Sequence, residues 1–532
     1  MPVTFIRRIN DMRLKPYAGF LFLLFCISCS VHKPVREHNA PINRLPTIEP
    51  DYTDIVLPPN SAPMNFIVQE AATAYYVEFS AKTGKSLVVS SSSPSIRIPF
   101  RPWKELLNKN RGHTLQITVY IRDQHKAWHS FQPILNEIAA DDIQPYLAYR
   151  LIKPLYVYWD QMGLYQRDLT SFRERPIILN RTTGGNCVNC HSFHNYNPDR
   201  FLFHMRAGEV GTAMMLAYDG NIYKIDTSTS FNRATAYRAW HPNGQIVAFS
   251  ANTVNQFFHT VGENRDVYDK ASDLVLYNVA NNMITSCPDI ATSERMETYP
   301  EWSPDGKYLY FCATDGLQVY DPEGEHPYRQ IKYDLMRIPF DAATNFWGSV
   351  EPVLLASEFG QSVTHPKVSP DGQYVLFCMS SYGNFSIYKQ DADLYLLDTQ
   401  TKEYDRLYLL NSDKTESYHS WSRDGRWIVF SSKREDGVCA RPYFSHVDAS
   451  GHFSKPYVLP QKNPAFYRTF FKTYNIPEFI SGPVRVRPQK LARSAWDNNN
   501  VIKANLDPKL GERVEESEDP MWKPVQKGRK KI

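Results

Sequence analysis

Alternating apolar and polar positions dominate the chain from residue 61 onward. Between residues 61 and 130 the stretches "AYYVEFSA", "SLVVSSS" and "LQITVYIRD" alternate with a period of two and are separated by Gly, Ser, Pro and Asn. This pattern predicts a small β-sandwich over 61–130. The next segment, 131–185, contains "FQPILNEIAADDIQPYLAYRLI", whose apolar spacing is helical, so we expect a short helical connector there.

A short block then recurs along the chain. It reads "WHPNGQIVAFS" from Trp240, "WSPDGKYLYFC" from Trp302, "VSPDGQYVLFC" from Val368 and "WSRDGRWIVFS" from Trp421, with a degraded copy, "YNPDRFLFHM", from Tyr196. Asn-Gly and Asp-Gly supply the positive φ that a two-residue hairpin turn requires. Each block therefore predicts a β-hairpin.

The spacing of the blocks predicts the fold. The turns recur at positions 199, 243, 305, 371 and 424, and each hairpin is followed by a further strand that ends in an acid or an amide. Such units have the length of one four-stranded blade with loop insertions, as in a β-propeller. Five blades are visible over 186–465, and we expect a sixth from the segments flanking 193–460.

The Trp-Ser-Pro-Asp-Gly repeat resembles that of TolB-like β-propellers, which commonly have six blades. The resemblance implies an all-β fold: a propeller preceded by a small immunoglobulin-like β-sandwich and the helical connector. Some relatives carry a serine peptidase after the blades. The extension 466–532 is too short for one, no G-x-S-x-G motif occurs, and its charged, Pro-rich end predicts partial disorder.

The first residues read as a targeting segment. Basic residues precede the apolar run "AGFLFLLFCIS", which predicts a secretory signal over 1–29. "CISCS" resembles a bacterial lipobox and implies lipidation of Cys29, which would tether the chain to a membrane of the cell envelope, in the periplasm or at the outer membrane. Ordinary signal cleavage and an uncleaved anchor are the alternatives. Residues 30–60 are Pro-rich and predict a linker.

Composition narrows the class of partner. Hydrophobic residues make up 42% and charged residues 22% of the 532, which is typical of a folded protein, and the formal net charge is only +4. No basic stretch in the body of the chain alternates with aromatic residues as a nucleic-acid site would require. We therefore expect no nucleic-acid partner.

The motif "GGNCVNCHSF", residues 184–193, carries the candidate chemistry. Cys187, Cys190 and His191 have the C-x-x-C-H spacing of c-type cytochromes, in which two thiols bind the vinyl groups of one porphyrin and the imidazole ligates the iron. The resemblance implies one covalently attached haem c. Its attachment would require export, because bacterial cytochrome c maturation takes place outside the cytoplasm.

The repeat also predicts where the motif lies. Counting back from each turn gives the start of each blade's first strand, near the central channel, at Phe193, Tyr237, Tyr299, His365 and Tyr418. The motif should then lie at one rim of the channel. A sixth ligand for the iron would come from His204, Met205 or His365.

Other interpretations of the motif stay open. Cys187 and Cys190 could form a structural or redox disulfide, or a metal site with the nearby His194, His204 and Asp199. The first functional hypothesis is thus a tethered haem propeller for electron transfer or redox sensing, acting with a redox partner or an envelope protein. The alternative is a non-catalytic scaffold that binds an envelope protein, peptide or glycan, with Cys187 and Cys190 structural. An enzymatic role is open, because no residue pattern names a substrate.

Overall fold

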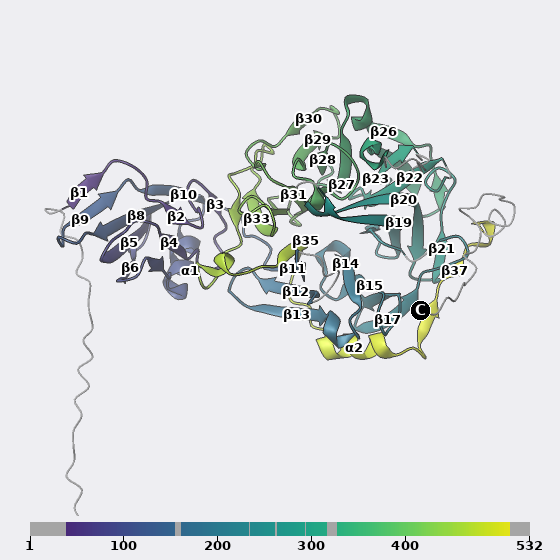
Figure 1. Cartoon of the computed structure of the whole chain (residues 1–532), viewed down its shortest axis with the longest axis horizontal. Helices are drawn as coiled ribbons and strands as arrows, with labels where there is room; N and C mark the ends of the chain where they lie inside the picture. The colour runs from purple at the N-terminus through teal and green to yellow at the C-terminus, as the bar shows by residue number, and fades with distance from the viewer. Residues whose placement is uncertain are drawn as a thin grey trace, which may run out of the picture.

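The computed structural model describes residues 39–154, 161–232, 235–260, 263–292, 294–315 and 327–510. The strands form a small N-terminal domain and a large ring of sheets beside it (Figure 1). The predicted signal segment, Cys29 and the first part of the predicted linker lie outside the described residues. Within the described part of the chain, no helix is both long enough and apolar enough to cross a membrane.

Two sheets and one helix build the N-terminal domain. The larger sheet contains β1 (Asn39–Ile42), β3 (Val56–Leu57), β5 (Ala74–Ala81), β6 (Leu87–Ser91), β8 (Thr114–Arg122), β9 (Trp128–Phe131) and β10 (Ile134–Ile138). The smaller contains β2 (Ile48–Glu49), β4 (Phe66–Val68) and β7 (Ser95–Ile96). Phe66 and Phe79 pack together from the two sheets, at 6.4 Å between ring centroids. The domain is therefore layered as predicted, but it is wider than 61–130.

The helix of this domain was not predicted. It is α1 (Phe100–Lys109), and its buried residues Trp103, Leu106 and Leu107 have the i, i+3, i+4 spacing of an amphipathic helix. The Trp103 ring meets Phe79 edge-on at 5.9 Å. A ten-residue helix between two strands is too short to interrupt the alternating pattern clearly, so the pattern alone did not separate it.

Six sheets, one per blade, form the ring. In each blade the strands follow one another from the central channel outward. Blade 1 contains β35 (Thr473–Ile480), β11 (Tyr146–Ile152), β12 (Gly163–Asp168) and β13 (Glu174–Leu179); blade 2 contains β14 (Cys187–Phe193), β15 (Arg200–Arg206), β16 (Ala213–Tyr218), β17 (Asn221–Asp226) and β36 (Val501–Lys503). Blade 3 contains β18 (Arg238–Trp240), β19 (Ile246–Thr260), β20 (Glu263–Asn278), β21 (Met283–Thr285) and β37 (Asn505–Leu506).

The remaining blades follow the repeat. Blade 4 contains β22 (Arg295–Trp302), β23 (Tyr308–Asp315), β24 (Asp334–Asp341), β25 (Phe346–Trp347) and β26 (Glu351–Leu354). Blade 5 contains β27 (Ser362–Val368), β28 (Tyr374–Ser380), β29 (Asp393–Asp398) and β30 (Tyr404–Arg406), and blade 6 contains β31 (Glu416–Trp421), β32 (Trp427–Ser432), β33 (Arg441–His446) and β34 (Tyr457–Val458). The prediction of an all-β, six-bladed propeller is confirmed.

The ring closes through strands from both ends of the propeller. β35 pairs antiparallel with β11, from Tyr146 opposite Ile480 to Ile152 opposite Thr473. The predicted helical connector over 131–185 is therefore wrong, because this segment supplies β10 and the three outer strands of blade 1. Leu147 to Ile152 are buried on both faces of β11, and a fully buried strand has no period of two that separates it from a helix.

The C-terminal extension is also more ordered than predicted as far as residue 510. After β35 come α2 (Pro488–Trp496) and then β36 and β37, which add parallel strands to the outer edges of blades 2 and 3 (Figure 1). Lys224 of β17 donates to the Ala495 carbonyl at 2.7 Å and to Asn498 at 2.6 Å. The extension thus covers the edges of two blades. Residues 511–532 lie outside the described part.

The turns of the repeat are longer than predicted. In blade 4, Ser303 N–H donates to the Tyr308 carbonyl at 2.9 Å, so four residues rather than two form the loop, and Gly306 N–H donates back to Ser303 at 2.9 Å. Gly306 has φ 73°, and a Cβ there would lie 2.4 Å from Nε2 of His241 in the neighbouring blade. Glycine is required both for the backbone conformation and for the contact between blades.

Ring closure makes a stability prediction. Phe479 of β35 is fully buried and packs on Phe444 of blade 6, whereas Phe471, just before the same strand, is 72% exposed. Phe479→Ala should lower the free energy of unfolding by about 3–5 kcal/mol, because it leaves a cavity at the closure. Phe471→Ala should change it by less than about 0.5 kcal/mol. Chemical denaturation of both variants checks this, and equal effects would contradict the closure.

Candidate functional site

The C-x-x-C-H motif lies on β14, the channel-side strand of blade 2. The pairing of β14 with β15 shifts between Asn189 and Ser192, which marks a β-bulge, and Cys190 has φ 51° there. The same bulge recurs on the channel-side strands of four other blades, with positive φ at Tyr299, His365, Tyr418 and Ile476. Cys190 is therefore the blade 2 member of this series.

This placement corrects the predicted alignment of the blades. Counting back from the turn assigned Phe193 to the series, three residues beyond Cys190. The hairpin of blade 2 is one residue longer than that of blade 4, since Phe193 pairs with Phe201 but Trp302 pairs with Leu309. Tyr196 to Asp199 therefore do not match the Ser-Pro-Asp-Gly turns. The motif lies deeper in the channel than predicted, with Cys190 at the level of the central rings.

Those rings close the channel. Tyr237 and Tyr299 lie 4.2 Å apart between centroids, Tyr299 and His365 lie 4.0 Å apart, and His365 and Tyr418 lie 4.9 Å apart. All four residues come from channel-side segments of consecutive blades. We call Tyr237, Tyr299, His365 and Tyr418 the ring plug. It separates the mouth of the channel from its deeper part.

The two thiols are free. Neither Cys187 nor Cys190 forms a disulfide; Cys187 is half-buried and Cys190 is 3% exposed. Burial raises the pKa of the Cys187 thiol, and the nearby guanidinium groups of Arg150 and Arg206 oppose this by favouring the thiolate. The described residues contain no group of three His, Cys, Asp or Glu side chains that could hold a metal ion. Cys312 and Cys378 are fully buried small side chains in blades 4 and 5.

The imidazole of His191 makes no hydrogen bond to any residue that the structure describes. The residue is 1% exposed, and within the described part of the chain neither Nδ1 nor Nε2 makes a hydrogen bond. Nε2 lies 4.0 Å from Oε2 of Glu478, on the closing strand β35. Burial lowers the pKa of His191 well below its usual value, Arg238 and Arg150 lower it further, and the backbone of Ile476 opposes this lowering. The ring is therefore neutral and offers a lone pair.

Three arginines surround the motif and are only partly satisfied. The Nε atoms of Arg150, Arg206 and Arg238 are buried, and none makes a hydrogen bond within the described residues. Arg150 donates through another nitrogen to the Asn189 side chain, and Arg206 donates to the Thr235 carbonyl at 2.9 Å. Buried donors without partners are uncommon in folded proteins. Their grouping here indicates a place for acceptor groups.

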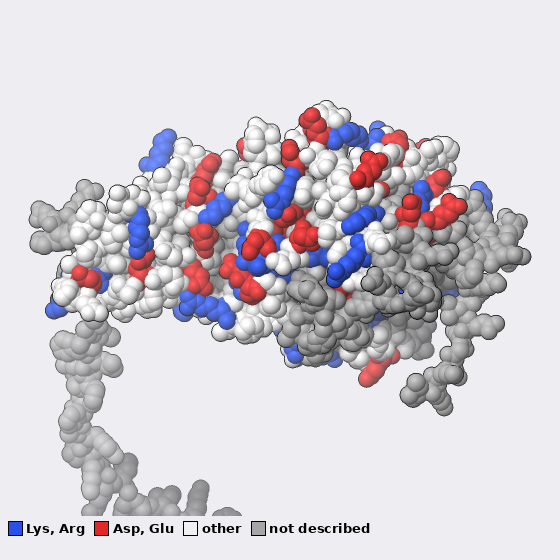
Figure 2. Space-filling view, turned by 45° about the horizontal axis from the view of Figure 1, so that its top comes forward, with Lys and Arg blue, Asp and Glu red and all other residues white. Residues whose placement is uncertain are grey.

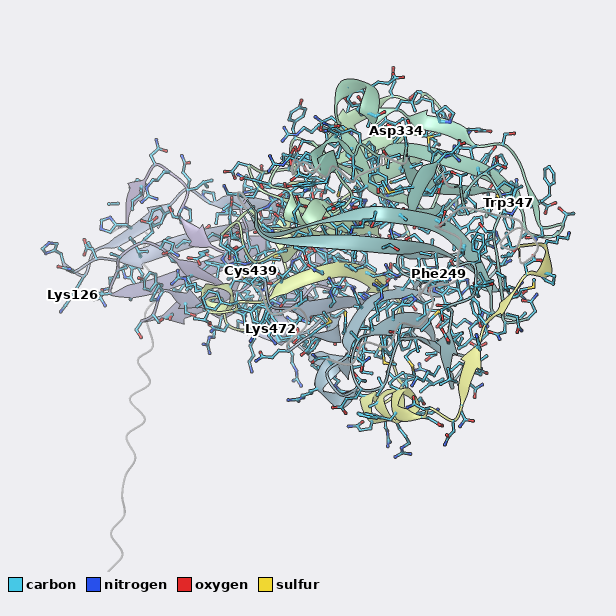
Figure 3. The ribbon with its side chains drawn as sticks, turned by 45° about the vertical axis from the view of Figure 1, so that its right-hand side comes forward. Lys126, Phe249, Asp334, Trp347, Cys439 and Lys472 are labelled. Carbon is cyan, nitrogen blue, oxygen red and sulfur yellow. The ribbon has the colours of Figure 1, made fainter. Side chains whose placement is uncertain are left out.

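The candidates for a sixth iron ligand lie in three different surroundings. His204 pairs with Asn189 across the strands, but its Nε2 lies 2.9 Å from Thr235 Oγ1 and its ring packs on Phe249 of blade 3. Figure 3 marks the position of Phe249 within the ring of sheets. Met205 is fully buried in the core between blades 1 and 2. His365 belongs to the ring plug, with its Nδ1 3.3 Å from Ser386 Oγ.

A cavity of about 430 Å³ opens above the ring plug, at the mouth of the channel. Its floor is the ring plug, and its wall carries both charged and aromatic side chains. The charged ones are Arg238, Glu301, Lys367, Arg423 and Glu478, and the largest aromatic ones are Trp240, Trp302 and Trp421. On blade 2 the cavity wall begins at Ser192, directly after His191. The cavity is therefore adjacent to the motif but does not include its thiols or imidazole.

Comparison with known proteins assigns no function to the chain. No family model matches the chain, and neither does any curated protein. Among solved structures it is similar to oligogalacturonate lyase from Vibrio parahaemolyticus (11% identity, 55% of this chain and 85% of that one, TM-score 0.30) and to the β-propeller domain of the trilobed protease from Pyrococcus furiosus (10%, 63% and 80%, 0.30). Kuenenia stuttgartiensis hydrazine synthase also matches (11%, 62% and 91%, 0.34).

Several residues around the motif were not predicted from the sequence. Arg150 and Glu478 come from β11 and β35 of blade 1, and Arg238 comes from the start of blade 3. Their positions in the chain, far from 187–191, carry no motif of their own. Only the repeat register could have found them, because Glu478 follows the bulge of β35 as Glu301 and Lys367 follow the bulges of β22 and β27.

The buried carboxyl of Glu478 makes a pH prediction. Burial raises its pKa to about 7, against the lowering effect of Arg238 and of the Phe193 N–H, which donates to Oε1 at 2.9 Å. Between the ordinary carboxyl pKa and about 7 the folded chain keeps a proton that the unfolded chain has lost. The protonated Glu478 carboxyl therefore contributes its full stabilisation below the ordinary carboxyl pKa. This contribution is lost as pH rises from there through about 7.

Unfolding free energies of Glu478→Gln and the unaltered protein, measured from pH 5 to 8, check this. The unaltered protein should lose stability relative to the variant as pH rises. Glu105→Gln, at an exposed position on α1, is the control and should run parallel to the unaltered protein, because Lys109 lowers the pKa of Glu105 and keeps it ionised throughout. Parallel curves for Glu478→Gln would contradict the raised pKa.

Proposed function

We propose that the chain is an exported, membrane-tethered β-propeller protein that carries one covalently attached haem c and serves in electron transfer or redox sensing. Cys187 and Cys190 would form the thioethers, and His191 would be the axial ligand. Cys29 would carry the lipid that holds the protein to a membrane of the cell envelope. A redox partner or an envelope protein would be its partner.

The unpartnered imidazole of His191 is the observation that carries the proposal. A buried ring with neither nitrogen bonded is costly unless something occupies one of them. Iron ligation would supply that partner and needs the neutral form, which the lowered pKa of His191 provides. Two free thiols immediately before the histidine, at the attachment spacing, complete the donor set.

The arginines support the same ligand class. Haem carries two propionate carboxylates, and within the described residues Arg150 and Arg206 have buried Nε donors without partners. Guanidinium groups form strong charge-assisted hydrogen bonds to carboxylates. These side chains would hold the propionates and, by their positive charge, would also favour the thiolate of Cys187 before attachment.

The protein's own residues would then set the redox behaviour. The bound haem supplies one-electron transfer. The burial of His191 and the nearby guanidinium groups disfavour added positive charge, so they would stabilise the reduced state and raise the reduction potential. Half-buried Cys187 would leave one edge of the attachment site close to the surface, where electron exchange with a partner takes place.

Covalent attachment is tested directly in a host that exports the protein and matures cytochromes c. The purified protein should keep its haem through denaturation and acid extraction, and Cys187→Ser/Cys190→Ser should lose it completely, because both thioether bonds are gone. Cys439→Ser changes a buried free thiol of blade 6 and should keep the haem. A colourless unaltered protein beside a matured control cytochrome would contradict the proposal and favour the scaffold.

Ligation by His191 is tested separately. His191→Ala should keep the thioether-bound haem but shift its spectrum to that of an iron without its histidine ligand, and imidazole added to the variant should restore the original spectrum. His194→Ala is the control, because that imidazole is engaged with the Pro242 carbonyl at 3.1 Å. An unchanged spectrum in His191→Ala would show that another residue ligates the iron.

A further inference from the structure

The mouth cavity has the size and enclosure of a small-molecule site. Its volume of about 430 Å³ lies within the range of ligand pockets, and the ring plug closes its floor. It lies at the channel end where the channel-side strands finish, whereas Cys187 begins its strand at the other end. The cavity is therefore a site separate from the thioether attachment.

Arg238 is the basic side chain of the cavity wall that is best placed to bind a ligand. Within the described residues no hydrogen bond or ion pair engages its guanidinium, and its Nε is buried. The nearby acids do not satisfy it: Glu301 is paired with Lys367 at 2.5 Å, and Glu478 accepts from the Phe193 N–H. A half-buried guanidinium without an acceptor destabilises the folded protein. Its planar fork of donors matches a carboxylate.

The charges of the wall favour an anion. The wall carries three basic side chains and two acidic ones, and the ion pair between Lys367 and Glu301 cancels one of each. Arg238 and the exposed Arg423 then face Glu478 alone. His365 and His419 contribute no positive charge, because burial lowers the pKa of each imidazole. The mouth is thus positive at neutral pH. Elsewhere on the molecule, the face seen in Figure 2 shows acidic and basic side chains interspersed.

The remaining wall is aromatic. Trp240, Trp302 and Trp421 line the cavity on three blades. The indole nitrogens of Trp240 and Trp302 are buried and have no hydrogen-bond partner among the residues that the structure describes. The Trp421 indole is already engaged with the Lys367 carbonyl at 3.0 Å. The rings of the ring plug below them are tilted or edge-on to one another. Aromatic faces and edges of this kind pack well against a ring-shaped body.

From this geometry we propose that the channel mouth binds a small organic carboxylate with a ring body, the carboxylate on Arg238 and the ring between the tryptophans and the ring plug. The site needs no haem for its function.

The experiment uses three probes that share one ring and differ in charge. They are 4-hydroxyphenylacetate, its methyl ester and tyramine, titrated calorimetrically into the purified full chain. The anion should bind more tightly than the ester by about tenfold or more, and tyramine should bind least. Arg238→Gln should remove this advantage, and Arg238→Lys should restore part of it by returning the charge without the fork. Arg493→Gln, on the exposed side of α2, is the matched control and should change nothing.

Two outcomes of the three-probe titration would overturn the proposal. One is equal affinity for the anion and the ester. The other is an anion advantage that survives in Arg238→Gln while the variant unfolds at the same denaturant concentration as the unaltered protein. The same titration on Cys187→Ser/Cys190→Ser separates this proposal from the haem proposal, because anion binding should persist in the variant without attached haem. Inorganic phosphate as a fourth probe tests for a general anion site, and binding of phosphate as tight as the carboxylate would also contradict the ring-bearing ligand.

Discussion

The pairing of β35 with β11 is the contact on which the rest of the molecule depends. A propeller of six separate hairpin units has two open edges where the chain enters and leaves it, and each edge would expose unpaired backbone groups. Here β35, which follows blade 6 along the chain, becomes the channel-side strand of blade 1, so both edges disappear in one sheet. The same pairing brings Arg150 and Glu478 beside His191, although they lie far apart in the sequence. The pairing of β35 with β11 therefore closes the ring and also brings the residues of the site together.

Burial of polar groups then gives the channel its chemistry. The ring plug and the bulged strands exclude water from the motif, so His191 is neutral and the carboxyl of Glu478 keeps a proton up to a pKa of about 7. Unsatisfied nitrogens of His191 and of three arginines gather on one side of the channel. Such groups destabilise a fold unless they meet a partner. We infer that the propeller retains them for bound groups: a prosthetic group at the motif and an anion at the mouth.

The sequence predicted the repeat better than it predicted the closure. Asp-Gly turns and alternating strands located the blades from Trp240, Trp302, Val368 and Trp421, because these signals are local. The strands of blade 1 were not predicted, since β11 is buried on both faces and its sequence is a nearly continuous apolar run. Cys187, Cys190 and His191 were recognisable from their spacing. Arg238 and Glu478 were not, because an isolated charge acquires meaning only when blade closure places it in a cavity.

Mass spectrometry of one tryptic peptide tests the central claim most directly. Cleavage after Arg181 and Arg200 releases the segment that contains both cysteines and His191. Protein purified from the membranes of an export- and maturation-competent host should yield this peptide with the mass of one haem added, and its fragments should carry that mass on Cys187 and Cys190. The same peptide with two unmodified thiols, or with a disulfide, would contradict the account.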